Sequence, residues 1–275
     1  MNDYFVNIGP ALAAEYEEET YNTAQTTNDK INSPSCAQFK FSPILVDNVA
    51  ATLRGLKANK TTGLDKIPAK ILKLSASIVA LSLTYIFNLS LAAGIYIDDW
   101  KHARVTPIFK SGHRRQCANY RPISILPVVS KVFEKEVFRQ VYSYLTENCM
   151  LSKFQSGFRP KHSTVTALIQ MCDNWLENMD NGKLNGVIFL DIKKAFDSIN
   201  HGILLNKMRI RFGISSTELK WFESYLSNRE QQCCINGQLS SKKKITCGVP
   251  QGSIFGPLLF LLYINDLPEI GRAHV

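Results

Sequence analysis

Asp191 is the residue whose type and position most clearly point to chemistry. It directly follows residues 186–190 (GVIFL), an apolar run whose length and composition predict a strand buried on both faces. A carboxylate at the end of such a strand is costly unless it is hydrogen-bonded or coordinates a cation. Two interpretations follow: Asp191 caps a turn, or it binds a metal ion.

Residues 248–256 (GVPQGSIFG) are the second stretch whose composition suits a binding site. Gly248, Gly252 and Gly256 allow the backbone to approach a ligand closely, and Pro250 stiffens the loop. The loop is not a Walker A motif, because no Gly-Lys-Ser or Gly-Lys-Thr follows it. The stretch therefore predicts a loop that lies against a ligand without being a P-loop.

The order of two motifs carries a family resemblance. LDIKKAFD at residues 190–197, followed by GVPQG at residues 248–252, resembles the reverse transcriptases of LINE-type (non-LTR), jockey-like retrotransposons. The resemblance covers residues 41–268 and implies an RNA-directed DNA polymerase, with an RNA template, a DNA primer and deoxynucleoside triphosphates as partners. It also implies Mg²⁺ as the cofactor, with Mn²⁺ as a substitute. We expect no stable protein partner.

The resemblance implies roles for single residues. Such polymerases use two metal ions to stabilise the attacking and leaving oxygens, and hard cations take carboxylate ligands. Asp191 matches the catalytic, metal-binding acid, and Ile192 is assigned to the same metal site. Arg159 and Lys161 are implied as phosphate contacts to nucleic acid. The residues implied in nucleotide binding are Lys110, Arg121, Phe196, Gln251 and Gly252. Phe196 would fill the space that a ribose 2′-OH needs.

Tyr96-Ile97-Asp98-Asp99 has the Y-x-D-D form of the family's second acidic motif, but it lies upstream of Asp191. In the family this motif follows the GVPQG loop, so we expect Asp98 and Asp99 to be turn residues. The last residues, EIGRAHV, match the translation of a sequencing adapter, and we expect residues 269–275 to be a scar. Without a second acidic motif we expect the chain as given to be inactive or nearly so.

The helices and strands expected along the chain, which must position these residues, indicate an α+β fold. By resemblance, residues 41–185 form the fingers of a right-hand polymerase and residues 186–268 part of its palm, with an incomplete antiparallel sheet packed on helices. Residues 1–40 are expected to be a partly disordered linker that opens with a short helix. Residues 128–146 carry a helical apolar stripe, and Asp197 is expected to cap the helix that follows it.

Residues 74–97 carry no charged side chain over 24 residues, a length that could span a membrane. The stretch nevertheless contains several Ser, Thr and Asn residues, and no aromatic belt flanks it. We expect a buried helix of the fingers and no membrane contact.

The net charge of +9 is concentrated in one segment. Residues 101–161 hold 12 Lys and Arg residues against three Glu, a net charge of +9 that equals the net charge of the whole chain. This concentration indicates a surface that binds the phosphate backbone of a nucleic acid. Seven scattered cysteines indicate reduced thiols in an intracellular protein, nuclear or cytoplasmic by resemblance. Two other functions stay open: a non-catalytic RNA- or DNA-binding remnant, and a metal-dependent nuclease that uses Asp191 with Asp197 or Asp98.

Overall fold

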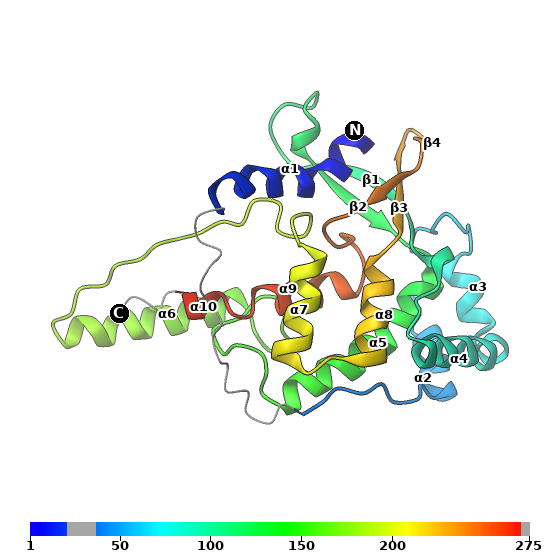
Figure 1. Cartoon of the computed structure of the whole chain (residues 1–275), viewed down its shortest axis with the longest axis horizontal. Helices are drawn as coiled ribbons and strands as arrows, with labels where there is room; N and C mark the ends of the chain where they lie inside the picture. The colour runs from blue at the N-terminus through cyan, green and yellow to red at the C-terminus, as the bar shows by residue number, and fades with distance from the viewer. Residues whose placement is uncertain (21–36, 271–275) are drawn as a thin grey trace.

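A five-stranded sheet and a set of packed helices form the body of the chain (Figure 1). The structure, a computed structural model, describes residues 1–20 and 37–270. Its helices are α1 (Asn2–Thr20), α2 (Val46–Arg54), α3 (Ala69–Leu74), α4 (Ala76–Ala93), α5 (Val128–Glu147), α6 (Thr164–Asp180), α7 (His201–Phe212), α8 (Ser216–Leu226), α9 (Phe255–Ile264) and α10 (Leu267–Ile270). Its strands are β1 (His102–Phe109), β2 (Tyr120–Ile125), β3 (Arg229–Ile235), β4 (Gln238–Leu239) and β5 (Lys243–Ile245). The mixture confirms the predicted class.

The sheet is mixed rather than wholly antiparallel. Its strands run in the order β2-β1-β3-β4, and β5 also pairs with β3. β1 and β2 form an antiparallel hairpin in which Arg121 lies opposite Ile108. β1 and β3 are parallel, with Val105 opposite Cys233, because a long crossover through helices joins them. The expected antiparallel pairing holds for the other pairs, and the β1–β3 pair is the exception.

α5 is the centre of the hydrophobic core. The apolar stripe predicted from residues 128–146 is buried, and Phe133 and Val137 are both 0% exposed. Phe133 stacks on Phe87 of α4 with ring centroids 4.4 Å apart, and it meets Trp221 of α8 edge to face. Burying each large apolar side chain contributes about 1.5–3 kcal/mol, so this cluster holds three helices together.

α4 buries only one face, so the expectation of a buried helix over residues 74–97 is correct for that face alone. Phe87 and Leu91 enter the core, whereas Ile78 is 78% exposed and Leu81 is 67% exposed. By length and composition α4 could cross a membrane, and 33% of it is buried inside the body.

α1 lies across the sheet (Figure 1). Its apolar residues Phe5 and Ile8 pack on Val105 and Cys233 of β1 and β3. The short helix expected at the start of residues 1–40 is therefore present, and its apolar face covers one face of the sheet. Residues 21–36 of that expected linker lie outside the described residues, as do residues 271–275 of the expected scar.

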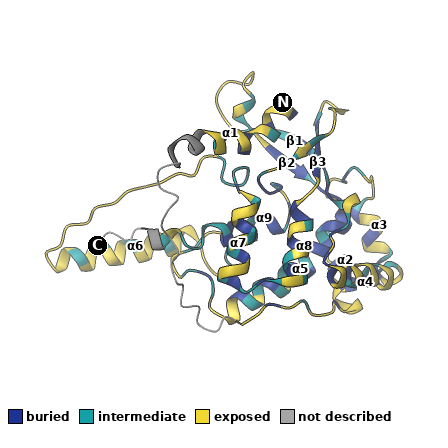
Figure 2. Cartoon of the chain, viewed as in Figure 1, coloured by how far each residue is buried: buried dark blue, intermediate teal, exposed yellow. Residues whose placement is uncertain are grey.

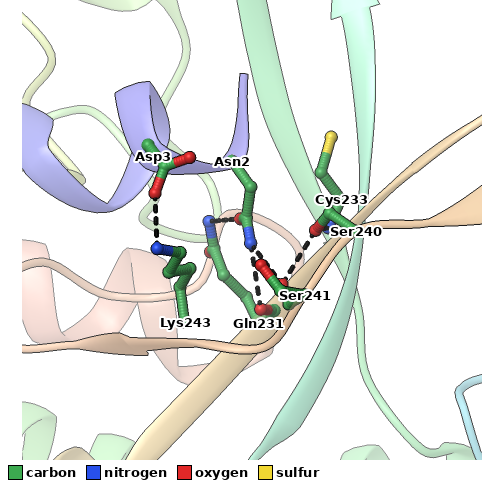
Figure 3. Close-up of polar contacts among 7 residues, drawn as sticks. All are labelled: Asn2, Asp3, Gln231, Cys233, Ser240, Ser241 and Lys243. Carbon is green, nitrogen blue, oxygen red and sulfur yellow. Dashed lines mark hydrogen bonds and ion pairs between the residues drawn. The ribbon is translucent and has the colours of Figure 1, made fainter.

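Polar contacts fasten the first turn of α1 to the strands beneath it (Figure 3). The Nε2 of Gln231 donates to Oδ1 of Asn2 at 3.0 Å, and Nδ2 of Asn2 donates to the backbone carbonyl of Ser241 at 2.9 Å. Asn2 is 5% exposed, so this pairing satisfies a buried amide. Asp3 forms an ion pair with Lys243 at 2.7 Å. The start of α1 is thus a fixed part of the fold.

The strand predicted at residues 186–190 does not form. Figure 2 shows α6 and the extended segment after it as an exposed arm that leaves the body. Ile188, Phe189 and Leu190 are more than 80% exposed. A buried strand needs neighbours that pair with its backbone and cover its faces, and the described residues supply neither for this run. The apolar composition of this run therefore predicted a buried strand, whereas the described part of the chain leaves the run exposed.

Candidate functional site

Asp197 and the loop at residues 248–253 form the best-defined polar site. The Nε2 of Gln251 lies 2.9 Å from both carboxylate oxygens of Asp197 and donates to them. Burial raises the pKa of Asp197, and the Gln251 hydrogen bond opposes that shift. The expectation that Asp197 caps the next helix is wrong, because Asn200 accepts the hydrogen bond from the Ile203 amide at the start of α7.

Backbone contacts hold the entrance of this loop. The amide of Gly248 donates to the carbonyl of Ile199, and the amide of Val249 donates to the carbonyl of Phe196, each at 2.8 Å. A Cβ on Gly248 would lie 2.8 Å from the Asp197 carbonyl, and its φ of +83° favours glycine. Gly248 therefore allows a close approach to the protein's own backbone, whereas the sequence predicted an approach to a ligand.

The middle of the loop rests on the β1–β2 hairpin. The amide of Ser124 in β2 donates to the carbonyl of Gln251 at 2.7 Å. A Cβ on Gly252 would lie 2.5 Å from the Ser124 carbonyl, so this approach requires glycine. The hairpin also carries Lys110 and Arg121, both exposed, near the turn that joins its strands. The structure thus places Gln251 and Gly252 against the hairpin that also carries Lys110 and Arg121, two other residues implied in nucleotide binding.

α1 closes the other side of the site. Gly9 packs so closely that a Cβ there would lie 2.4 Å from the Asp197 carbonyl and 2.7 Å from Sγ of Cys247. A small pocket of about 30 Å³ remains between α1, Asp197 and Gln251, with Phe5 in its lining. Such a volume holds a water molecule and no nucleotide.

Phe196 packs among other aromatic rings. It stacks on Phe260 of α9 at 5.3 Å and meets Phe158 edge to face at 5.7 Å. Phe158 belongs to residues 154–164 (FQSGFRPKHST), so the Phe196 ring joins three separate segments of the chain. Its role as a gate against ribonucleotides stays a prediction.

Arg159 and Lys161 differ in the contacts and exposure of their side chains. The Nη1 of Arg159 donates to the carbonyls of Ser152 at 2.8 Å and Gln155 at 3.2 Å, so this guanidinium holds its own loop. Lys161 is exposed and is the better placed of the two to reach a phosphate.

Asp191 and Ile192 lie on the exposed arm, outside the sheet. Ile192 offers a metal only its backbone carbonyl. Within residues 1–20 and 37–270, no group of three or more His, Cys, Asp or Glu side chains could hold a metal ion. The residues after Asp191 return to the body, where Lys193 and Lys194 line a groove of about 410 Å³ with α1. The described residues alone therefore do not fit a two-metal centre.

Asp98 and Asp99 are turn residues, as expected. They lie in a short 3₁₀ turn (Asp98–Trp100), where Asp98 forms an ion pair with Lys101 at 2.7 Å. Tyr96 is 0% exposed and packs edge to face on Trp221 and Tyr225 in the core. The Y-x-D-D form at this position therefore anchors a turn.

Sequence reasoning missed Glu134. It is 0% exposed on α5 and contacts the first residues of α9. Its position one turn from Ser130, beside the apolar stripe, was the signal that could have predicted a buried acid.

Known proteins match nearly the whole chain. Residues 108–274 match the family model of the reverse transcriptase (RNA-dependent DNA polymerase). Over 98% of its length the chain is 29% identical to the "Probable RNA-directed DNA polymerase from transposon BS" of Drosophila melanogaster, covering 30% of that protein. It is 31% identical over 89% of its length to the "Probable RNA-directed DNA polymerase from transposon X-element", covering 27% of that protein. A third relative is the "RNA-directed DNA polymerase from mobile element jockey", at 29% identity over 97% of the chain and 29% of the relative.

The chain spans less than a third of the length of these curated relatives. The family model nevertheless covers more than half of the chain and includes both motifs from which the resemblance was derived. This chain therefore belongs to the reverse transcriptase (RNA-dependent DNA polymerase) family.

Proposed function

We propose that this chain is the fingers and part of the palm of a non-LTR retrotransposon polymerase that copies RNA into DNA. Residues 41–185 would form the fingers and residues 186–268 the partial palm. The observation that carries the proposal is the Gln251–Asp197 contact, because it joins the two motifs into one site beside the β1–β2 hairpin. An intracellular location, in the nucleus or cytoplasm, is part of the same proposal.

The exposed cations of the hairpin would bind the incoming nucleotide. Arg121 offers a planar fork that matches phosphate oxygens, and Lys110 offers a point charge on a flexible stem. The backbone at Gly252 would lie against the base or the template. Other exposed cations of the 101–161 segment, Arg114, Arg115, Lys153 and Lys161, would hold the backbone of an RNA template and a DNA primer.

We propose Asp191 as a ligand for Mg²⁺ or Mn²⁺, the ions that would polarise the phosphoryl group in this chemistry. Asp197 accepts hydrogen bonds from Gln251 and Asp98 forms an ion pair with Lys101, and among the described residues neither joins Asp191 in a group of three metal-binding side chains. We therefore expect no DNA synthesis from the 275-residue chain by itself. The lack of such a group among the described residues also speaks against a nuclease built from Asp191 with Asp197 or Asp98.

A nucleic-acid-binding protein without catalysis is the second candidate. The concentration of positive charge between residues 101 and 161 favours it as well. The two functions differ in one respect, because a polymerase must bind deoxynucleoside triphosphate and a binding remnant need not.

The test is a titration of deoxynucleoside triphosphate into the chain bound to a labelled RNA–DNA hybrid with Mg²⁺. We expect saturable binding that Arg121→Gln weakens about ten-fold, because a charge-assisted phosphate contact is lost. Arg54→Gln, an exposed arginine on α2, is the matched control and should change nothing. Hybrid binding that weakens with salt, together with no response to the triphosphate, would favour the binding remnant instead.

A further inference from the structure

Glu134 is a fully buried acid in the middle of the core helix α5. Its side chain is 0% exposed, and it lies between the buried apolar residues Phe133 and Val137 of the same helix. A buried carboxylate is costly unless its oxygens accept hydrogen bonds and a positive group lies near. The partners that meet these needs therefore show what the residue does.

The partners of Glu134 lie at the exit of the loop that carries Gln251. Its Oε2 accepts from the backbone amide of Ile254 at 2.7 Å and from that of Phe255 at 3.4 Å. These amides begin α9, where a helix leaves N–H groups without internal partners and a negative charge is favoured. Glu134 thus fixes the chain three residues after Gln251.

Two further side chains, one from α8 and one from β3, complete the hydrogen-bond network around Glu134. The hydroxyl of Tyr225 donates to Oε1 of Glu134 at 3.2 Å. The guanidinium of Arg229, 0% exposed, lies over the Tyr225 ring and donates to the Tyr225 carbonyl at 2.9 Å. Burial raises the pKa of Glu134, and the charge of Arg229 opposes that shift. Two other nitrogens of Arg229 have no hydrogen-bond partner among the described residues.

The loop is therefore held at both ends by different means. Its entrance at Gly248 and Val249 is fixed by backbone contacts to residues 196–199, which belong to the first motif. Its exit is fixed by two side chains. The hydroxyl of Ser253, within the loop, donates to the Pro250 carbonyl at 2.9 Å and accepts from the Gly256 amide at 2.8 Å, and Glu134, which belongs to neither motif, reaches the exit from α5. A shift at the exit would move Gln251 relative to both Asp197 and Ser124.

We propose that Glu134 is a positioning residue: its buried carboxylate holds the start of α9 and thereby sets where Gln251 and Gly252 stand against the incoming nucleotide. The proposal rests on the proposed function for its link to the nucleotide. Its structural half, the anchoring of the loop, stands without that function.

Hydrogen exchange tests the structural half. In Glu134→Ala we expect the amides of Ile254 and Phe255 to exchange about ten-fold faster than in the wild type, because their acceptor is lost. Glu134→Gln keeps an acceptor oxygen and should leave exchange within about two-fold. Unchanged exchange in Glu134→Ala would overturn the proposal.

Glu136→Ala is the matched control, since it removes another buried acid of the same helix. Glu136 is 4% exposed and bonds to Thr52 and Arg139, away from the loop. Its removal should lower the melting temperature without changing exchange at Ile254. If Glu134→Ala does not fold, Glu134→Asp, which withdraws the carboxylate but keeps its charge, should show the same pattern to a smaller extent. Equal exchange changes in the Glu134 and Glu136 variants would overturn the proposal.

Triphosphate binding tests the functional half. In the hybrid-bound chain, Glu134→Ala should weaken deoxynucleotide binding about as much as Gln251→Ala, and the double variant should lose little more than either alone. Additive losses would contradict positioning through Gln251. If the wild type binds no triphosphate, the proposed function fails, and the exchange result still decides whether Glu134 anchors the loop.

Discussion

The side-chain amide of Gln251 donates hydrogen bonds to both carboxylate oxygens of Asp197, at 2.9 Å each. The two residues are 54 positions apart in the sequence and belong to different motifs. Their contact explains why the motifs occur together: each supplies half of one polar site, which the β1–β2 hairpin and α1 enclose.

Asp197→Asn should change how stability depends on pH. Burial raises the pKa of Asp197, so the folded state holds its proton to a higher pH than the unfolded chain does. Its contribution to stability is therefore full below the ordinary pKa of 3.8 and is lost as the pH rises through the raised value. Urea unfolding from about pH 4 to pH 7 should show wild type losing stability relative to Asp197→Asn. Parallel curves for the two proteins would refute this assignment.

His201→Gln should remove the loss of folding stability that the wild type shows as the pH falls. The Nε2 of His201 lies 2.7 Å from the Gly248 carbonyl, and burial lowers the pKa of the ring. The stabilising neutral form is present above the ordinary pKa of 6.5 and is lost as the pH falls through the lowered value. Between about pH 7 and pH 5 the wild type should weaken while His201→Gln, whose amide still donates, should not. His201→Ala, which lacks the donor, should be weaker at every pH.

Gly9→Ala should destabilise the chain although alanine normally favours a helix. The added Cβ would lie 2.4 Å from the Asp197 carbonyl, so α1 must move off the site or distort, at a cost of about 1–3 kcal/mol. Gly202→Ala in α7 is the control, because its Cβ would meet only the Asn200 side chain at 3.3 Å. Thermal unfolding gives the cost, and hydrogen exchange over residues 2–14 shows whether α1 has left the sheet. Equal behaviour of the two variants would argue against tight packing at Gly9.

Ile188→Lys should leave stability unchanged and reduce aggregation. Ile188 is 86% exposed on the extended arm, where consecutive apolar residues with unpaired backbone invite association. Phe133→Ala, in the core, should by contrast cost about 3–5 kcal/mol. Light scattering and urea unfolding measure the two effects. A large loss of stability in Ile188→Lys would mean that the run is buried in solution, as the sequence alone predicted.

Local patterns predicted the parts of the fold whose partners are close in sequence. The apolar stripe of α5 has a helical period that needs no distant information, and its residues are buried as expected. The glycines of the GVPQG loop were likewise predictable, because Gly248 and Gly252 occupy backbone positions that other residues rarely adopt.

Long-range partners were not predictable. Asp197 and Asn200 are both good capping residues three positions apart, and only the contact with Gln251 decides that Asn200 is the cap. Residues 186–190 have the composition of a buried strand, but composition does not supply the neighbouring strands. Glu134 was missed because its acceptor role depends on an amide 120 positions away.

Primer extension tests the central claim most directly. The assay compares the chain, a chimera whose residues after 268 are replaced by the corresponding downstream segment of the jockey polymerase, and the same chimera with Asp191→Ala. We predict deoxynucleotide incorporation on an RNA template by the chimera alone, since only it combines Asp191 with the family's second acidic motif. Extension by the Asp191→Ala chimera, or by the chain alone in a way that Asp98→Ala abolishes, would contradict the account.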